Sequence, residues 1–96
     1  MNIQDLLATK RKQILHIASK HGARNVRVFG STAQGKAHDG SDVDILVDLD
    51  PGRSLLDHAA LLVELEDLLE CKVDVVTVKG LRARIRDRVL REAVPL

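Results

Sequence analysis

Aromatic residues are almost absent from this chain of 96 residues, which contains one Phe and neither Trp nor Tyr. A hydrophobic core must therefore be built from Val, Leu, Ile and Ala. A chain of this length buries only about 60% or slightly more of the surface that its unfolded state exposes. We therefore expect modest stability, or support from a partner. The scarcity of aromatics also removes the stacking platform that many proteins use to hold single-stranded nucleic acid.

Other scarcities exclude further classes of protein. A single cysteine cannot form an intramolecular disulfide, and no Cys or His cluster indicates a zinc site. No apolar run reaches the roughly 18 residues that a membrane-spanning helix needs. The formal net charge of +1 creates no overall field that would draw the chain to nucleic acid or to anionic lipid. Because Gln4 and Asp5 stand where a signal peptide would be basic and apolar, we expect a cytoplasmic protein.

The residues that are present favour one α/β (α+β) domain over residues 1–96. Hydrophobic residues make up 45% and charged residues 30% of the chain, which is the balance of a folded protein. Helical spacing and β-branched alternation succeed one another along it. In chain order we expect a helix between the Asn2 cap and Gly22, a strand over Asn25–Phe29, a loop over Gly30–Ser41 with one helical turn, a strand over Val43–Leu49, a helix from the Ser54 cap through Glu70, a strand over Lys72–Val78 and a helix over Leu81–Ala93. This order predicts a mixed sheet of three or more strands packed with helices.

Carboxylates on two of these strands need an explanation. Asp42 and Asp44 lie two residues apart, so both side chains emerge on one face of the strand. Like charges held that close repel unless a cation lies between them. Mg²⁺ is typically bound by one or two carboxylates together with substrate phosphates. Asp74 lies in a Val-rich strand, where a carboxylate is costly unless it faces water, a partner or a metal.

Simpler explanations exist for the same carboxylates. Asp48 and Asp50 continue the alternation, as they would on a solvated acidic strand. Asp74 could be a charge that protects an edge strand from aggregation. Arg27, which alternates with valines in the preceding strand, is expected to be exposed.

The loop before the acidic strand favours a metal site over these simpler explanations. Gly30 and Ser31 directly follow a strand, and glycine lets a backbone approach a phosphate without a Cβ in the way. Amides at a helix start and a hydroxyl can then hold the phosphate oxygens. The loop is neither a Walker motif nor a dinucleotide fingerprint, because its glycines are spaced by five and no Gly-Lys-Ser/Thr follows. Gly-Ser followed after ten intervening residues by Asp-x-Asp on a strand is a much more specific pattern for a phosphate and metal site than either element alone.

The stretch Val28–Val47, VFGSTAQGKAHDGSDVDILV, closely resembles the signature of the DNA polymerase β-like nucleotidyltransferase superfamily. Within it, the chain is similar to the minimal nucleotidyltransferases, which are commonly paired with HEPN-domain partners. Phe29, Gly30 and Ser31 match the first element of the signature, Asp42 and Asp44 match the second, and Asp74 matches the third. One position departs: Gln34 stands where the family often has Arg. Gln lacks the charge and the bidentate fork that suit phosphate.

The resemblance implies a small polymerase β-like fold and a Mg²⁺-dependent transfer of AMP from ATP, or of another NMP, to a hydroxyl. Asp42 and Asp44 would hold two Mg²⁺ ions, and Asp74 would complete the second site or act as base. Gly30 and Ser31 would position the β- and γ-phosphates. In the family's toxin–antitoxin setting the acceptor is a tyrosine of a cognate HEPN toxin, which the modification silences.

Two other functions stay open. The chain could be an antitoxin without catalysis that neutralises its toxin by occlusion, for which the loss of charge at Gln34 argues. It could also bind RNA through the arginines of the last helix, although nucleic acid is not the partner we expect. Those arginines are Arg82, Arg84, Arg86, Arg88 and Arg91. His38 lies in the motif loop, where we expect it to be solvated.

The leucines of the third helical segment predict association. They are too many for one narrow stripe, and an open sheet also leaves edges to cover. The leucines concerned are Leu55, Leu56, Leu61, Leu62, Leu65, Leu68 and Leu69. We expect a stable complex with a HEPN-like protein or, failing that, a homo-oligomer. The last helix should contribute to the interface.

Overall fold

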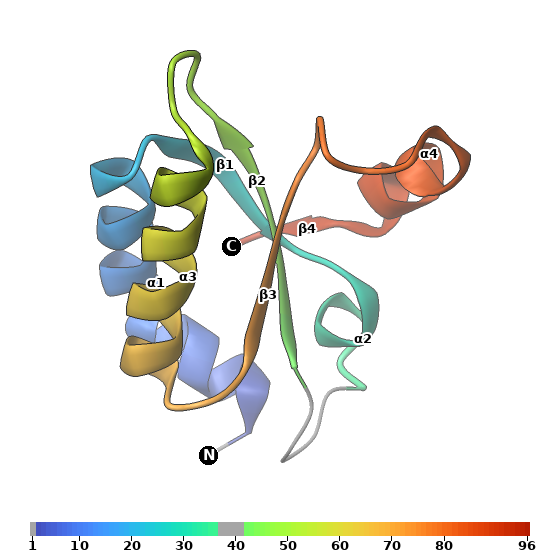
Figure 1. Cartoon of the computed structure of the whole chain (residues 1–96). Helices are drawn as coiled ribbons and strands as arrows, with labels where there is room; N and C mark the ends of the chain where they lie inside the picture. Colours follow the sequence, from blue (N-terminus) through green and yellow to red (C-terminus); the bar gives the residue numbers. More distant parts are fainter. Residues whose placement is uncertain (1, 37–41) are drawn as a thin grey trace.

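The computed structural model describes residues 2–36 and 42–96, and helices alternate with strands along them (Figure 1). The helices are α1 (Ile3–Lys20), α2 (Gly30–Ala33), α3 (Leu55–Leu69) and α4 (Ala83–Glu92), and the strands are β1 (Ala23–Val28), β2 (Val43–Leu49), β3 (Val73–Thr77) and β4 (Val94–Pro95). No helix in the described part of the chain is long and apolar enough to cross a membrane. All of the expected helices and strands are present, with ends that differ by at most two residues. Only β4 was not predicted, because two residues are too few to show a period.

Side-chain caps determine where the two longest helices begin. The Asn2 side chain accepts a hydrogen bond from the Asp5 amide at 2.8 Å. At the start of α3, Ser54 and Asp57 form a capping box: the Ser54 hydroxyl accepts from the Leu56 amide, and the Asp57 carboxylate accepts from the Ser54 amide. Each cap satisfies amides that have no partner within the helix, and a cap is worth about 1 kcal/mol. The helix starts expected from the sequence are therefore confirmed by local chemistry.

The sheet has the strand order β3-β2-β1-β4 and contains both directions of pairing. β1 is antiparallel to β2, with Val28 opposite Ile45, and β4 adds a short antiparallel strand beside β1. β2 and β3 are parallel, and α3 forms the crossover between them. Because parallel strands begin at the same end of a sheet, the starts of β2 and β3 lie side by side. Asp44 is thereby placed opposite Asp74.

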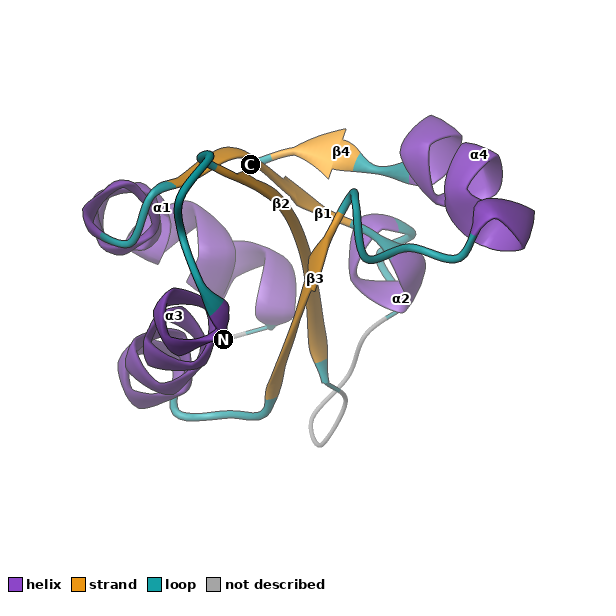
Figure 2. Cartoon of the chain, turned by 45° about the horizontal axis from the view of Figure 1, so that its top comes forward, coloured by secondary structure: helices purple, strands orange, loops and turns teal. Residues whose placement is uncertain are grey.

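The helices lie on both faces of the sheet, α1 and α3 on one face and α2 and α4 on the other (Figures 1 and 2). Side chains alternate along β2 between these two layers. Ile45 and Val47 are buried in the core that includes α1 and α3. Leu46 points the opposite way and packs with Val89 of α4 in a second, smaller cluster. Asp44 therefore faces the layer of α2 and α4.

Side chains of α3 bond to the outer edge of β3. The Glu66 carboxylate accepts a hydrogen bond from the Val73 amide at 3.2 Å. The Val75 carbonyl accepts a hydrogen bond from Nε2 of His58 at 2.7 Å, so that nitrogen carries the proton. Free amides and carbonyls on an edge strand are a template for pairing with another chain. These two contacts close part of the edge that the sequence led us to expect open.

Candidate active site

The turn after β1 brings Gly30 against a carboxylate of the neighbouring strand. Gly30 has a φ of +59°, a conformation that is costly for residues with a Cβ. A Cβ built on Gly30 would lie 2.7 Å from Oδ2 of Asp44, which is closer than non-bonded atoms approach. The backbone conformation therefore favours glycine here, and a Cβ would in addition displace the Asp44 carboxylate.

The first turn of α2 presents polar groups next to Gly30. The first hydrogen bond of the helix runs from the Ala33 amide to the Phe29 carbonyl at 3.3 Å. The amides of residues 30–32 precede this bond, as the first amides of any helix do. Ser31 is exposed beside them. The sequence predicts that these amides and this hydroxyl bind the phosphate oxygens.

The three predicted carboxylates come from the starts of β2 and β3. Asp44 and Asp74 are opposite one another on parallel strands, whose axes are typically about 4.8 Å apart. Asp42 directly precedes β2. Asp42 and Asp74 are exposed, whereas Asp44 is half-buried. The topology thus brings Asp74 to the Asp-x-Asp pair, although it is far from the pair in the sequence.

Asp44 is the electrostatic centre of this group. Burial raises the pKa of Asp44, and the neighbouring charges of Asp74 and Asp42 raise that pKa further. Among residues 2–36 and 42–96, no Lys, Arg or His forms an ion pair with any of the three carboxylates. Negative charge is therefore concentrated here, and no cationic side chain of the described residues pairs with it.

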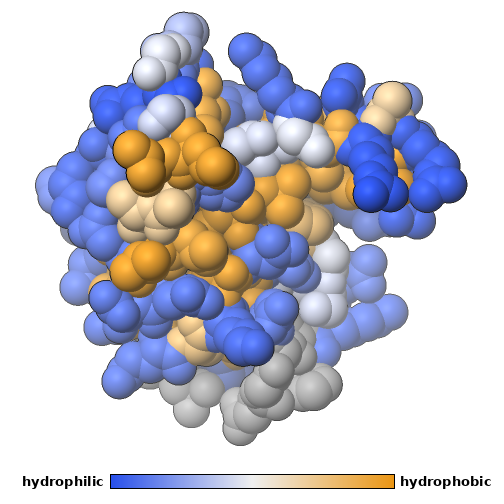
Figure 3. Space-filling view, viewed as in Figure 1, coloured by the Kyte–Doolittle hydropathy of each residue, from blue (hydrophilic) through white to orange (hydrophobic). Residues whose placement is uncertain are grey.

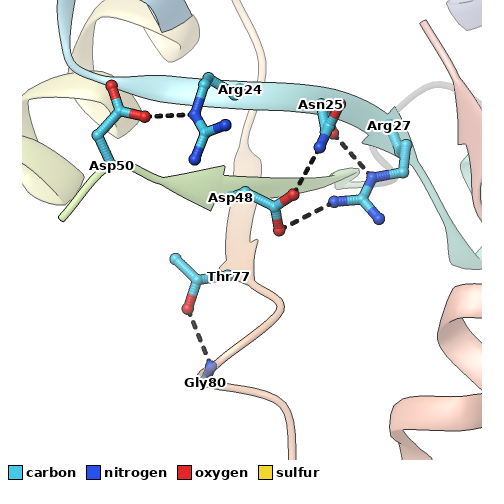
Figure 4. Close-up of polar contacts among 7 residues, drawn as sticks. All are labelled: Arg24, Asn25, Arg27, Asp48, Asp50, Thr77 and Gly80. Carbon is cyan, nitrogen blue, oxygen red and sulfur yellow. Dashed lines mark hydrogen bonds and ion pairs between the residues drawn. The ribbon is translucent and has the colours of Figure 1, made fainter.

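The next two acidic residues along the chain have such partners (Figure 4). Asp48 accepts a hydrogen bond from the Asn25 amide group at 2.8 Å and pairs with Arg27 at 3.3 Å. Asp50 pairs with Arg24. The expectation that Arg27 is exposed is wrong: its side chain is only 18% exposed because it lies against Asp48. Asp48, in β2, and Asp50, which follows β2, thus bond to side chains of β1. The carboxylates at the start of β2 make no such bonds within the described residues.

The carboxylates at the start of β2 and β3 suit a hard divalent cation. Mg²⁺ prefers oxygen ligands and usually takes one or two carboxylates plus phosphates and water. Within the described residues, no three His, Cys, Asp or Glu side chains are already gathered at ligand geometry. Carboxylates of like charge keep apart without a cation. Burial first, and then repulsion from Asp74 and Asp42, raises the pKa of Asp44, and a bound cation would relieve the repulsion.

Thr32 is a residue of this site that the sequence pattern does not reveal. Its side chain is fully buried, and its hydroxyl accepts a hydrogen bond from the Asp44 amide at 3.1 Å. Its carbonyl accepts a hydrogen bond from the Gln4 side chain at 2.7 Å. A threonine in a small polar loop is too common to attract notice from sequence alone. Only the folded chain shows that it touches both α1 and β2.

The remaining residues considered from the sequence lie around the site or outside it. Gln34 ends α2 and is exposed. His38 lies outside the described residues. Cys71 is half-buried against the core, and burial, with Glu66 and Asp42, raises the pKa of its thiol. Of the arginines near the end of the chain, Arg86 is half-buried and donates to the Leu81 carbonyl, and the others are exposed: Arg82, Arg84, Arg88 and Arg91.

A surface cavity of about 520 Å³ lies at the other end of the parallel strands. It is lined by the ends of β2 and β3 and by the turn over residues 51–53. Its charged lining includes Arg24, Asp48 and Asp50, whose ion pairs are already described. Neither Gly30 nor any of the three predicted carboxylates lines it. The cavity is thus separate from the candidate site.

Comparison with known proteins identifies the class of this fold and site. The family model of the nucleotidyltransferase domain matches residues 10–96. The chain therefore belongs to the nucleotidyltransferase domain family, and it is an enzyme of that class. The sequence resemblance and the expected fold class are both confirmed.

The similar proteins in this family include protein adenylyltransferases and a minimal nucleotidyltransferase of known structure. Protein adenylyltransferase MntA of Thermococcus cleftensis is 40% identical over 92 residues, which are 96% of this chain and 90% of that protein. A Methanocaldococcus jannaschii protein, provisionally named a protein adenylyltransferase, is 40% identical over 98% of this chain and 97% of its own length. A solved structure provisionally identified as a minimal nucleotidyltransferase superposes with a TM-score of 0.90 at 49% identity, covering 100% of this chain and 97% of that one.

A more distant structure shares the fold. It is the crystal structure of a toxin–antitoxin with AMP-PNP, and it superposes with a TM-score of 0.75 at 22% identity. The superposition covers 88% of this chain and 69% of that one. The arrangement of helices and sheet is therefore common to both proteins.

Proposed function

We propose that residues 1–96 act as one Mg²⁺-dependent nucleotidyltransferase domain that transfers AMP from ATP to a hydroxyl of a partner protein. The acceptor in this proposal is a tyrosine of a cognate HEPN-domain toxin, and the chain acts as its antitoxin in the cytoplasm. The observation that carries the proposal is the placement of Asp44 opposite Asp74 with Gly30 packed on the Asp44 carboxylate. The turn to which we assign phosphate binding thus lies beside a group of carboxylates.

The carboxylates have separate roles in this proposal. Asp42 and Asp44 would hold Mg²⁺, with two ions in the complete site, and Asp74 would complete the second site or accept a proton. When bound, Mg²⁺ neutralises phosphate charge and lowers the pKa of an attacking hydroxyl. The crowding of negative charge at Asp44 supports these roles, because carboxylates that repel one another favour a cation between them.

Gly30 and Ser31 would orient the triphosphate. The acceptor oxygen forms a bond to the α-phosphorus, the bond to the bridging oxygen breaks, and pyrophosphate leaves with that oxygen. The hydroxyl proton passes to a base, for which Asp74 is the candidate. Such a step depends mainly on positioning and on charge neutralisation, both of which a fixed turn beside fixed carboxylates supplies.

The exposed apolar surface supports a protein partner. Leu55 and Leu56 are each 80% exposed, and Val63 of the same helix is 56% exposed. Figure 3 shows apolar surface gathered over the side of the molecule where α3 and β3 face the viewer. The names of the relatives, protein adenylyltransferases, and the toxin–antitoxin structure of the same fold agree with a protein acceptor.

A second candidate function is an antitoxin without catalysis, which would neutralise its partner by occlusion. The observation that favours it is Gln34, exposed at the end of α2 where the family often has Arg. The presence of Asp42, Asp44 and Asp74 at one end of the sheet argues against it, because a protein that acts by occlusion has no need of crowded carboxylates.

The two functions are distinguished by co-expression with the product of the neighbouring gene and measurement of the partner's intact mass. We expect an increase by one or more AMP units and its disappearance with the Asp42→Asn variant. The Asp50→Asn variant serves as a control, because its carboxylate pairs with Arg24 away from the site. A partner that binds the wild-type chain and keeps its unmodified mass would favour occlusion.

A further inference from the structure

The ladder between β1 and β2 ends in an irregular way next to Asp44. The Phe29 amide donates to the Asp44 carbonyl at 3.1 Å, as in an antiparallel pair. In a regular pair the Asp44 amide would donate back to the Phe29 carbonyl. That carbonyl instead accepts from the Ala33 amide at 3.3 Å, which is the first hydrogen bond of α2. Because the chain turns into α2 here, the Asp44 amide does not have the acceptor that a regular ladder would provide.

Thr32 supplies the missing acceptor. Its hydroxyl accepts from the Asp44 amide at 3.1 Å. It is the one polar side chain that is buried among the residues the structure describes, with no exposed surface. A buried amide left without a partner is costly, which explains why a polar side chain is kept inside the molecule.

A second contact fixes Thr32 from the opposite side. The Gln4 side chain, in the first turn of α1, donates to the Thr32 carbonyl at 2.7 Å. Thr32 is thus bonded through its carbonyl to α1 and through its hydroxyl to β2. Both bonds bridge segments that are far apart in the sequence, 28 residues for Gln4 and 12 for Asp44.

We infer that Thr32 is a positioning residue for the nucleotide site. Its hydroxyl keeps the backbone of Asp44 in register with the turn that carries Gly30, so that carboxylate and phosphate-binding turn move as one unit. This inference rests on the proposed function, because it takes Asp44 and Gly30 to meet the same ligand. It adds a group that touches neither metal nor nucleotide.

The test compares variants of Thr32 with and without the hydroxyl. Thr32→Val and Thr32→Ala both remove the hydroxyl; Val keeps the shape of the side chain, and Ala adds no bulk. Thr32→Ser retains the hydroxyl. One readout is hydrogen exchange of the Asp44 amide by NMR, and the other is calorimetric titration with ATP in the presence and absence of Mg²⁺. Val26→Ala, in the core on the opposite face of β1, is the control for general destabilisation.

We expect the Val and Ala variants to exchange the Asp44 amide faster and to bind Mg²⁺–ATP more weakly, each by roughly tenfold, as for the loss of one hydrogen bond of about 1.4 kcal/mol. Thr32→Ser should retain both properties, and Val26→Ala should lose stability but not ATP affinity. ATP affinity unchanged in both hydroxyl-free variants would overturn the inference and leave the proposed function standing. If the wild-type chain itself shows no Mg²⁺-dependent ATP binding, the proposed function fails and the inference fails with it.

Discussion

Replacing Asp44 with asparagine should stabilise the metal-free protein while it abolishes nucleotide transfer. Asparagine has nearly the same shape, so the close contact with Gly30 and both backbone bonds of Asp44 can remain. The change removes the repulsion from Asp74 on the adjacent strand. It also replaces one carboxylate oxygen and removes the negative charge, both of which the proposed Mg²⁺ site requires.

The size of the stabilisation follows from the strand spacing. Two unit charges about 4.8 Å apart repel by roughly 1 kcal/mol in water and by roughly 3.5 kcal/mol at an effective dielectric constant of about 20. Because Asp74 is exposed, the smaller value applies. A gain of about 1 kcal/mol raises the Tm of a domain of this size by roughly 4–8 °C.

The effect should depend on pH in a direction set by the raised pKa of Asp44. That pKa lies above its ordinary value of 3.8, so the folded state binds the proton more tightly than the unfolded state. The wild-type protein therefore loses stability as the pH rises from about 3.8 through the raised pKa. The advantage of Asp44→Asn should be full at neutral pH and should vanish in acid.

Thermal unfolding without divalent metal, at low salt, measures this difference. Asp48→Asn is the matched control, because it breaks the pairing with Arg27 and should lower the Tm. In a double-mutant cycle, Asp44→Asn and Asp74→Asn should stabilise less together than the sum of the single changes, because each removes the same repulsion. If Asp44→Asn lowers the Tm at neutral pH, the account of Asp44 as a repelled carboxylate is wrong.

Three other outcomes are expected. Gly30→Ala should remove Mg²⁺–ATP binding in calorimetry, whereas Gly52→Ala, also at positive φ but with open space around its Cβ position, should cost only stability; equal ATP affinity in both would refute the phosphate role of the turn. ATP should bind much more tightly with Mg²⁺ than without it, and the affinity should fall as acid protonates Asp44, starting at a higher pH than for an ordinary Asp; a flat pH profile would contradict this. Leu55→Glu combined with Leu56→Glu should hardly change the unfolding free energy, since both side chains are 80% exposed, but should abolish the complex with the co-expressed partner in sedimentation; a complex of unchanged size would place the interface elsewhere.

The sequence by itself determines the local elements and predicts which residues form the candidate site. Asn2, Ser54 and Asp57 mark helix starts because a cap needs only neighbours along the chain. The bounds of β2 follow from its run of alternating and β-branched residues. The Gly-Ser turn and the Asp-x-Asp pair can be recognised at their spacing, since the chemistry of phosphate and Mg²⁺ restricts which residues serve there.

Only the tertiary structure decides which carboxylates lie close together. Asp48 and Asp50 continue the same pattern as Asp44, and the arginines of β1 distinguish them by pairing with these two alone among the described residues. Asp74 reaches Asp44 because α3 returns the chain to a parallel strand in one particular register. The reason is physical: register and ion pairing depend on contacts between segments distant in sequence, and no local propensity encodes them. The contact of Thr32 also depends on tertiary structure. Its hydroxyl accepts from the Asp44 amide only because the ladder of β1 and β2 ends where α2 begins.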